Sequence, residues 1–223
     1  MTMAQGYFVT GTDTGIGKTW STLALMQYYQ DLGKTVLGMK PIASGCEWEG
    51  GQLKNEDALL IHEQASIDLP YQDINPYAFE LPVSPHIAAA EAGVNIEISH
   101  VIAQYQKLAK MADVVLVEGV GGWLVPLNEF EVVADLAKQL CLPVIVVVGM
   151  RLGCINQAKL TFAAIEQAGV KCHGWIASCV DPDMQMLDEN IATISKATPM
   201  PLLAVLPFLE KIDKHMLAKK IVK

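Results

Sequence analysis

Short runs of apolar, often β-branched residues alternate along this chain with longer stretches in which apolar residues recur at helical spacing. This alternation is typical of βαβ units built around a parallel sheet. Most of the short runs are apolar without interruption, as expected of strands that are covered by helices on both faces. The runs predict strands at residues 7–9, 36–39, 114–117, 144–148, 175–177 and 202–205.

The stretches between these runs predict the helices. Gly33 and Gly169 lie just past two of them, where a left-handed cap is expected. Residues 66–85 carry four prolines and form the only long stretch for which we predict no element; such loops are often functional. No domain boundary is visible, so we predict one domain over residues 1–223. Helices are predicted at residues 18–31, 55–64, 85–92, 98–110, 132–140, 156–168 and 188–196, and in the tail from residue 211.

Composition narrows the class of protein. Hydrophobic residues make up 52% of the 223 residues, and the mean hydropathy of +0.30 excludes disorder for most of the chain. The longest strongly apolar run, residues 142–150, is half of the roughly 18 residues that a spanning helix needs. Without a visible secretory signal, we expect a cytoplasmic protein with no membrane partner. The net charge of −8 disfavours binding to nucleic acid.

The metal-binding side chains are scattered. Five cysteines include no C-x-x-C pair, and the five histidines show no ligand spacing. A disulfide framework or zinc site is therefore not expected, and we predict buried thiols in a reducing compartment.

A glycine-rich segment, residues 11–19, follows the first predicted strand and leads into a predicted helix. It ends in Gly17-Lys18-Thr19, in which backbone N–H groups would cradle phosphates, the lysine would reach the β/γ-phosphates and the hydroxyl would bind Mg²⁺. Five residues separate Gly11 from Gly17, whereas the strict motif has four. The dinucleotide pattern G-x-G-x-x-G is absent from this segment. We therefore expect a P-loop NTPase-like α/β fold, with a mostly parallel central sheet and helices on both faces.

Ligands in open α/β sheets lie beyond the carboxyl ends of the strands. Glu118 directly follows a predicted strand, the position of a Walker-B-type acid, although it could also cap a loop. Lys40 ends another strand and is either a site residue or a solvated cation. Asp57 by itself fits best as an acid in the first turn of a helix. These residues are the candidates for charge chemistry near the phosphates.

The motifs resemble those of the dethiobiotin synthetases of biotin biosynthesis. The opening Gly-Thr-Asp-Thr with its offset Gly-Lys-Thr also accounts for the five-residue spacing. Strand spacing extends the resemblance to about residue 209. The matching runs are residues 7–14, 17–19, 40–41, 43–45, 84–86, 117–119, 121–123 and 152–156.

The resemblance implies a reaction of 7,8-diaminopelargonate, CO₂ (or bicarbonate) and ATP that gives dethiobiotin, ADP and phosphate. A carbamate and a carbamic-phosphoric anhydride are the implied intermediates, with ATP as co-substrate and Mg²⁺ as cofactor. It also implies a homodimer with its site at the subunit interface.

The family pattern further implies site residues. Lys18, Lys40 and Thr14 would be catalytic, and Ser44 would bind the carbamate or the amines. Gly153, Cys154, Ile155 and Asn156 would receive the substrate carboxylate from the neighbouring subunit. Mg²⁺ would be held by Thr19, Asp57 and Glu118. The nucleotide would contact Gly15, Ile16, Gly17, Lys18, Thr19, Trp20, Asp57, Glu118, Gly119, Val120, Gly121, Ser178, Cys179, Pro207, Phe208 and Leu209.

Two features leave alternatives open. Family members often carry Asn where this chain has Ser178, so we expect weaker discrimination of ATP from other nucleotides.

Five lysines in residues 211–223 suit a membrane-surface helix, as in a partitioning or division-site nucleotide-switch ATPase, or a solvated helix packed on the domain. Such switches usually carry an early lysine in their phosphate loop, and none precedes Lys18. A cobyrinate-type amidoligase would need a glutaminase domain for which 223 residues leave no space.

Overall fold

The sheet is parallel throughout and has β1 near its middle. In the computed structural model, which describes residues 4–222, six strands are hydrogen-bonded in the order β10-β9-β8-β1-β7-β2. Each neighbouring pair is parallel, so all six carboxyl ends lie at one edge. Every predicted strand is confirmed. The strands are β1 (Gln5–Gly11), β2 (Val36–Met39), β7 (Val114–Glu118), β8 (Val144–Met150), β9 (Cys172–Cys179) and β10 (Leu202–Leu206).

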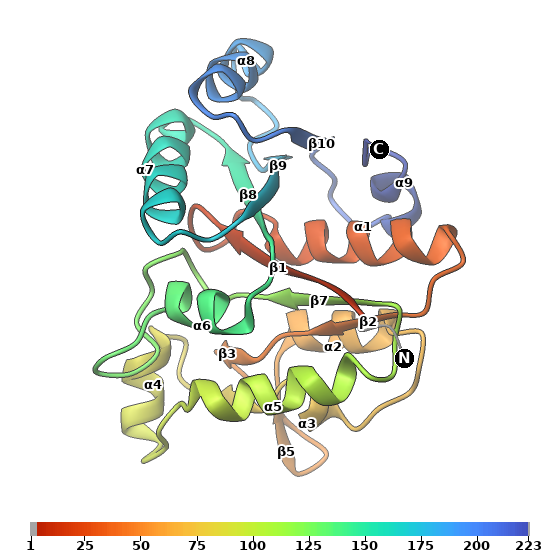
Figure 1. Cartoon of the computed structure of the whole chain (residues 1–223), viewed down its shortest axis with the longest axis vertical. Helices are drawn as coiled ribbons and strands as arrows, with labels where there is room; N and C mark the ends of the chain where they lie inside the picture. The colour runs from red at the N-terminus through yellow and green to blue at the C-terminus, as the bar shows by residue number, and fades with distance from the viewer. Residues whose placement is uncertain (1–3, 223) are drawn as a thin grey trace.

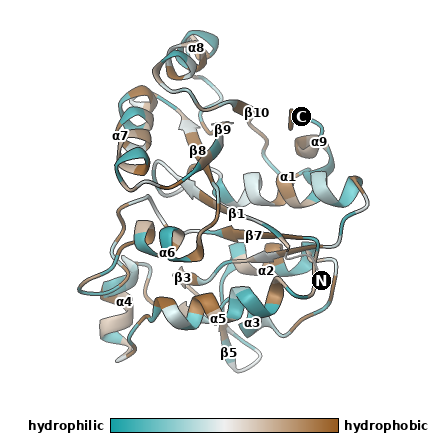
Figure 2. Ribbon diagram, in the orientation of Figure 1, coloured by the Kyte–Doolittle hydropathy of each residue, from teal (hydrophilic) through white to brown (hydrophobic). Residues whose placement is uncertain are grey.

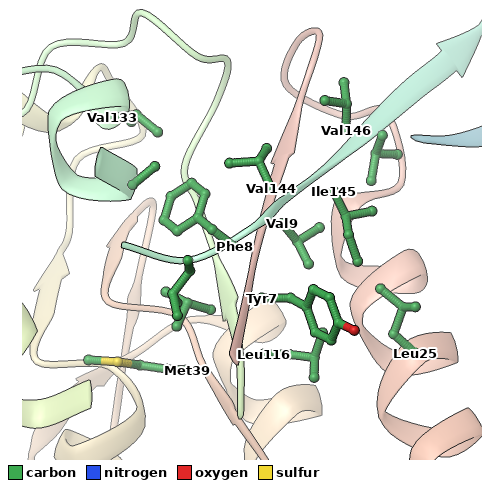
Figure 3. Close-up of a cluster of buried hydrophobic side chains, with 14 of the residues drawn as sticks. Tyr7, Phe8, Val9, Leu25, Met39, Leu116, Val133, Val144, Ile145 and Val146 are labelled. Atoms are coloured by element: carbon green, nitrogen blue, oxygen red, sulfur yellow. The ribbon is translucent and has the colours of Figure 1, made fainter. Parts of the chain in front are cut away.

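The central strands are apolar on both faces because helices cover both. Phe8 of β1 points toward Val133, whereas Tyr7 points to the opposite side, toward Leu25 (Figure 3). The strands at the centre are correspondingly hydrophobic, and the helices around them show mixed faces (Figure 2). Burying one such large side chain stabilises the fold by about 1.5–3 kcal/mol, so this double-sided core explains the uninterrupted apolar runs.

The helices divide between the two faces. Helix α1 lies on one face with α9 beside it, and α6 and α7 lie on the other (Figure 1). All eight predicted helices are present, but the tail helix is only five residues long, and α7 begins two residues before the predicted start. The helices are α1 (Lys18–Asp31), α2 (Glu56–Gln64), α4 (Pro85–Glu91), α5 (Ile98–Leu108), α6 (Val133–Leu140), α7 (Cys154–Gln167), α8 (Leu187–Ala197) and α9 (Lys214–Ala218).

The lysine-rich tail helix packs onto the domain. Leu217 and Ala218 of α9 are buried against the core, and α9 contacts α1. This arrangement favours the packed, solvated helix over the membrane-surface helix. No helix within residues 4–222 is both long and apolar enough to cross a membrane.

Residues 66–85 are more regular than predicted. They contain α3 (Tyr71–Ile74) and β6 (Tyr77–Phe79), and β6 pairs in parallel with β3 (Ile42–Ser44). A hairpin of β4 (Glu47–Glu49) and β5 (Gln52–Lys54) follows β3. Strands of three residues are too short to show an apolar pattern in the sequence, and they form through pairing. The prediction that residues 66–85 contain no helix or strand is therefore wrong for residues 71–79.

The cysteines are free, as expected, but the prediction that all are buried is wrong. Cys46 and Cys154 are buried, while Cys141 is exposed and the remaining two are half-buried. Gly33 and Gly169 have φ values of 75° and 68°, which confirms the left-handed caps after two helices.

Candidate functional site

The phosphate loop lies at the carboxyl edge of the sheet, between the end of β1 and the start of α1. Gly15 and Gly17 adopt φ values of 68° and 82°, which other residues rarely tolerate. A Cβ on Gly17 would also lie 2.3 Å from the Ser178 hydroxyl oxygen. No side chain in the described part of the chain caps the N-terminus of α1, so its first N–H groups are available to an anion.

Lys18 begins α1 and is buried beside the loop. Its Nζ donates a hydrogen bond of 2.7 Å to the Asp13 carbonyl oxygen. Burial, reinforced by the charge of Lys40, lowers the pKa of Lys18 to about 8, although Glu118 and Asp57 oppose this change. A bound polyphosphate would place more negative charge beside Lys18 and would stabilise its ammonium form.

Lys40 at the end of β2 is buried between two carboxylates. Its Nζ lies 2.6 Å from Glu118 Oε1 and 3.0 Å from Asp57 Oδ2. Burial alone would lower the pKa of Lys40, but the two carboxylates outweigh it and hold that pKa above its usual range. Burial likewise would raise the pKa of Asp57, and the Lys40 charge holds it below its usual range. The solvated-cation interpretation of Lys40 is therefore wrong.

Glu118 ends β7 with both carboxylate oxygens paired. Thr19 Oγ1 donates to Oε1 at 2.9 Å, and Thr22 Oγ1 donates to Oε2 at 2.7 Å. Glu118 is fully buried, so it is not a loop-capping acid. Asp57 lies in the first turn of α2, as its position in the sequence predicts, and it also faces Lys40.

The donor set around Lys40 fits a small divalent cation. Two carboxylates contact the Lys40 ammonium, and the Thr19 hydroxyl contacts one of them; all three groups offer hard oxygen donors. Within residues 4–222 there is no cluster of three or more His, Cys, Asp or Glu side chains that could hold a metal ion. A magnesium ion here would therefore complete its shell with nucleotide oxygens or water, as Mg²⁺ commonly does.

A cavity of about 710 Å³ opens over these groups. Ser44 lines the cavity, and its Oγ is buried without a hydrogen-bond partner in the described residues. Glu118 and Gly119 do not line the cavity, but Glu118 contacts Lys40, which does. The predicted residues that do line it are Thr14, Gly15, Ile16, Gly17, Lys18, Thr19, Trp20, Lys40, Ser44, Asp57, Val120 and Gly121.

Other residues line the cavity but were not predicted as site residues from the sequence. Asn55 is the N-cap of α2, and Val83 and Val125 lie outside helices and strands. Ser84 and Pro85 also line the cavity and belong to a run matched to the family, which was their available signal.

A second group of predicted residues lies beside the phosphate loop. Ser178 near the end of β9 is buried against Gly17, and Leu206 of β10 pairs with it in register. The neighbouring predicted residues end β9 or follow β10, and they do not line the 710 Å³ cavity. They are Cys179, Pro207, Phe208 and Leu209.

The third predicted group starts α7. Gly153 precedes the helix with φ of 97°, and the Cys154 side chain is fully buried, which leaves only its backbone for a ligand. This end of α7 reaches the phosphate loop through Asp13. Arg151 Nη2 lies 2.6 Å from Asp13 Oδ2, and Gln157 Nε2 donates to the same oxygen at 3.3 Å.

Thr22 and Arg151 are polar contacts that the sequence reasoning missed. Thr22 follows Thr19 at i+3 on α1, a spacing that places both hydroxyls on one helix face. That spacing was its signal. Arg151 follows a buried strand at the edge where ligands are expected.

Comparisons with known proteins agree with this geometry. A family model described as an AAA domain matches residues 5–216. The chain is 46% identical over 218 residues to the ATP-dependent dethiobiotin synthetase BioD of Aromatoleum aromaticum, covering 98% of this chain and 97% of the relative. It is 44% identical over 221 residues to that of Nitrosospira multiformis, covering 98% and 95%.

Solved structures show the fold alone. The MinD cell division protein of Aquifex aeolicus matches with a TM-score of 0.59 and 16% identity, covering 98% of this chain and 88% of that one. A ParA family ATPase from Chlorobium tepidum matches with a TM-score of 0.59 and 13% identity, covering 97% and 90%. The predicted P-loop α/β fold is confirmed, and the sequence relatives separate this chain from the nucleotide switches. The chain belongs to the family of ATP-dependent dethiobiotin synthetases.

Proposed function

We propose that this chain converts 7,8-diaminopelargonate, CO₂ and ATP to dethiobiotin, ADP and phosphate in the 710 Å³ cavity. The observation that carries the proposal is the placement of Lys18, Lys40 and Ser44 around one cavity at the phosphate loop, with no partner for the Ser44 hydroxyl within residues 4–222. Two buried cations suit a reaction in which a carbamate and a phosphoryl group carry negative charge close together.

In the proposed sequence, one substrate amine attacks CO₂ and loses a proton, which gives a carbamate. A carbamate oxygen then attacks the γ-phosphorus, and the bond to ADP breaks. The second amine attacks the carbonyl carbon of this mixed anhydride, phosphate leaves, and the ureido ring closes. Lys18 and Lys40 stabilise the carbamate and the transferring phosphoryl group, while Thr14 and Ser44 hold the carbamate or the amines.

Thr19, Asp57 and Glu118 would hold Mg²⁺, which neutralises phosphate charge when bound. The structural support is the set of oxygen donors around Lys40. Lys40 remains charged beside these acids, so it would act as a fixed cation and not as a base.

We further propose a cytoplasmic homodimer of single-domain subunits, in which the start of α7 receives the substrate carboxylate from the neighbouring subunit. Leu152, next to that helix, is 99% exposed, and an apolar side chain in this position is suited to contact with a second chain. The N–H groups that begin α7 suit a carboxylate. Five free thiols agree with a reducing compartment.

The direct test combines the protein with Mg-ATP, bicarbonate and 7,8-diaminopelargonate and measures phosphate and dethiobiotin. We expect phosphate release to require the diamine and to match dethiobiotin in amount. ATP turnover that ignores the diamine and yields no dethiobiotin would contradict the proposal and would favour a nucleotide switch.

A further inference from the structure

Residues 66–85, here called the proline-rich segment, contain two buried polar side chains that take no part in the proposed chemistry. Tyr71 begins α3 and Asn75 follows its end, and they are 7% and 3% exposed. Neither lines the 710 Å³ cavity. Buried polar groups need hydrogen-bond partners, and the partners of these two lead directly to the site.

Asn75 and its neighbours fasten the backbone at the end of β2. Asn75 Nδ2 donates to the Lys40 carbonyl oxygen at 2.7 Å, and the Lys40 N–H donates to the Ile74 carbonyl oxygen at 2.9 Å. The Tyr77 N–H donates to the Pro41 carbonyl oxygen at 3.1 Å. Both polar backbone groups of Lys40 are therefore held by this segment.

Tyr71 carries the connection on to α2. Its hydroxyl donates to Asn75 Oδ1 at 2.9 Å and accepts from the Asn55 N–H at 2.8 Å. Asn55 caps α2 by accepting from the Ala58 N–H, and Asp57 lies in the same first turn.

The hydrogen bonds and the ion pair close a ring. The path runs from Asn55 through Tyr71 and Asn75 to the Lys40 backbone, and the Lys40 side chain returns to Asp57 at 3.0 Å. Three separate elements, β2, α2 and α3, thus fix where one ammonium meets one carboxylate.

We propose that Tyr71 and Asn75 are positioning residues that set the placement of Lys40 against Asp57 for the phosphoryl-transfer step. This inference rests on the role proposed for Lys40 and adds a function for the proline-rich segment. Small displacements of a charged group in a preorganised site are costly, since a misplacement of about 1 Å can lower the rate about 100-fold. Removing the Tyr71 hydroxyl also takes one partner from the buried Asn75 side chain and one from the half-buried Asn55 N–H.

The test replaces the hydroxyl alone. Tyr71→Phe should lower kcat about tenfold or more, the effect of roughly one hydrogen bond at the transition state, while KM for ATP stays within about twofold. Tyr105→Phe is the matched control, because Tyr105 is similarly buried, lies outside the cavity and has no side-chain hydrogen bond within residues 4–222. It should keep full kcat.

A double-mutant cycle separates positioning from general structural support. In a Lys40→Met background, Tyr71→Phe should change the residual rate by less than about twofold, because the group on which it acts is gone. Tyr71→Phe with unchanged kcat, or with the same loss in both backgrounds, would overturn the inference. If Tyr71→Phe does not fold, Asn75→Ala takes its place under the same criteria. A wild-type protein that makes no dethiobiotin would instead reject the proposed function.

Discussion

Lys18 is a cation whose pKa the fold has lowered to about 8, mainly through burial. Above pH 8 the free protein therefore holds this side chain largely neutral. Nucleotide phosphates would raise the pKa again, because negative charge favours the ammonium form. The binding of ATP should then take up protons at mildly alkaline pH.

We predict proton uptake approaching one per ATP at about pH 9, and little uptake by Lys18 near pH 6.5. Calorimetric titration in buffers of different ionisation enthalpy measures this number directly. Lys18→Arg is the control, since a guanidinium stays charged throughout this range. Equal uptake in Lys18→Arg, or none in the wild type, would contradict the assignment.

Lys40 is the second residue on which the site depends. Lys40→Met leaves Glu118 buried without its cation and should lower kcat about 100-fold or more. The free energy of unfolding at pH 7 should fall by about 3–5 kcal/mol, as for other broken buried pairs. Enzyme kinetics and urea unfolding provide the two measurements.

The control for Lys40→Met is Lys54→Met, which removes an ion pair with the exposed Glu49. That change should lower the free energy of unfolding by less than about 1 kcal/mol. The pKa of Asp57 is lower in the folded protein than in the unfolded chain. Its contribution to the free energy of unfolding is therefore fully present above the usual aspartate pKa and is lost as the pH falls through the pKa of the folded state. A stability loss at pH 7 no larger than that of Lys54→Met would contradict the buried pair.

Residue types at strand ends predicted much of the site. Lys18, Lys40 and Glu118 followed from the phosphate loop and from two apolar runs, and the structure brings all three together. Which atoms they contact could not be predicted. The pairing of Tyr71 with Asn75 depends on a short helix that has no periodic pattern of its own.

At the scale of elements, the strands whose residues are buried on both faces could be predicted from the sequence. The six parallel strands are continuous apolar runs because both faces are covered, and this pattern is visible in the chain. Strands β3 and β6 are three residues each and pair across more than thirty residues of chain, so their alignment comes from tertiary contacts. The early start of α7 reflects Gly153, whose left-handed backbone allows the helix to begin there.

Ser178, near the end of β9, is the residue from which we predict nucleotide preference. Ser178 is 6% exposed and offers one hydroxyl, whereas an asparagine can both donate to and accept from a base. We expect Ser178→Asn to raise the preference for ATP over GTP and CTP, measured as the ratio of kcat/KM values. Cys172→Ala, at the opposite end of β9, is the control and should leave the ratio unchanged. Equal losses with GTP and CTP in the wild type and in Ser178→Asn would reject the idea.

The whole molecule carries a net charge of −8, yet its proposed substrates are anions. At the carboxyl edge of the sheet, Lys18 and the start of α1 lie beside Lys40, whose charge is balanced by Asp57 and Glu118. Fixed local charge, not net charge, is what this protein offers to a phosphate.

The assembly can be tested through one exposed side chain. Leu152→Glu should shift the protein from dimer to monomer in light scattering and raise KM for the diamine, with little change in the free energy of unfolding. Leu32→Glu, at the far end of α1 from the phosphate loop, is the exposed control and should leave the dimer intact. A monomeric wild type with full activity would contradict the interface.

The most direct measurement of the central claim follows oxygen through the reaction. Enzyme with Mg-ATP and the diamine is mixed with ¹⁸O-labelled CO₂ in unlabelled water and quenched before the label exchanges. If a carbamate oxygen attacks the γ-phosphorus, the released phosphate carries one ¹⁸O for each dethiobiotin formed. Unlabelled phosphate, released in the same amount with or without the diamine, would show hydrolysis by water and would contradict the account.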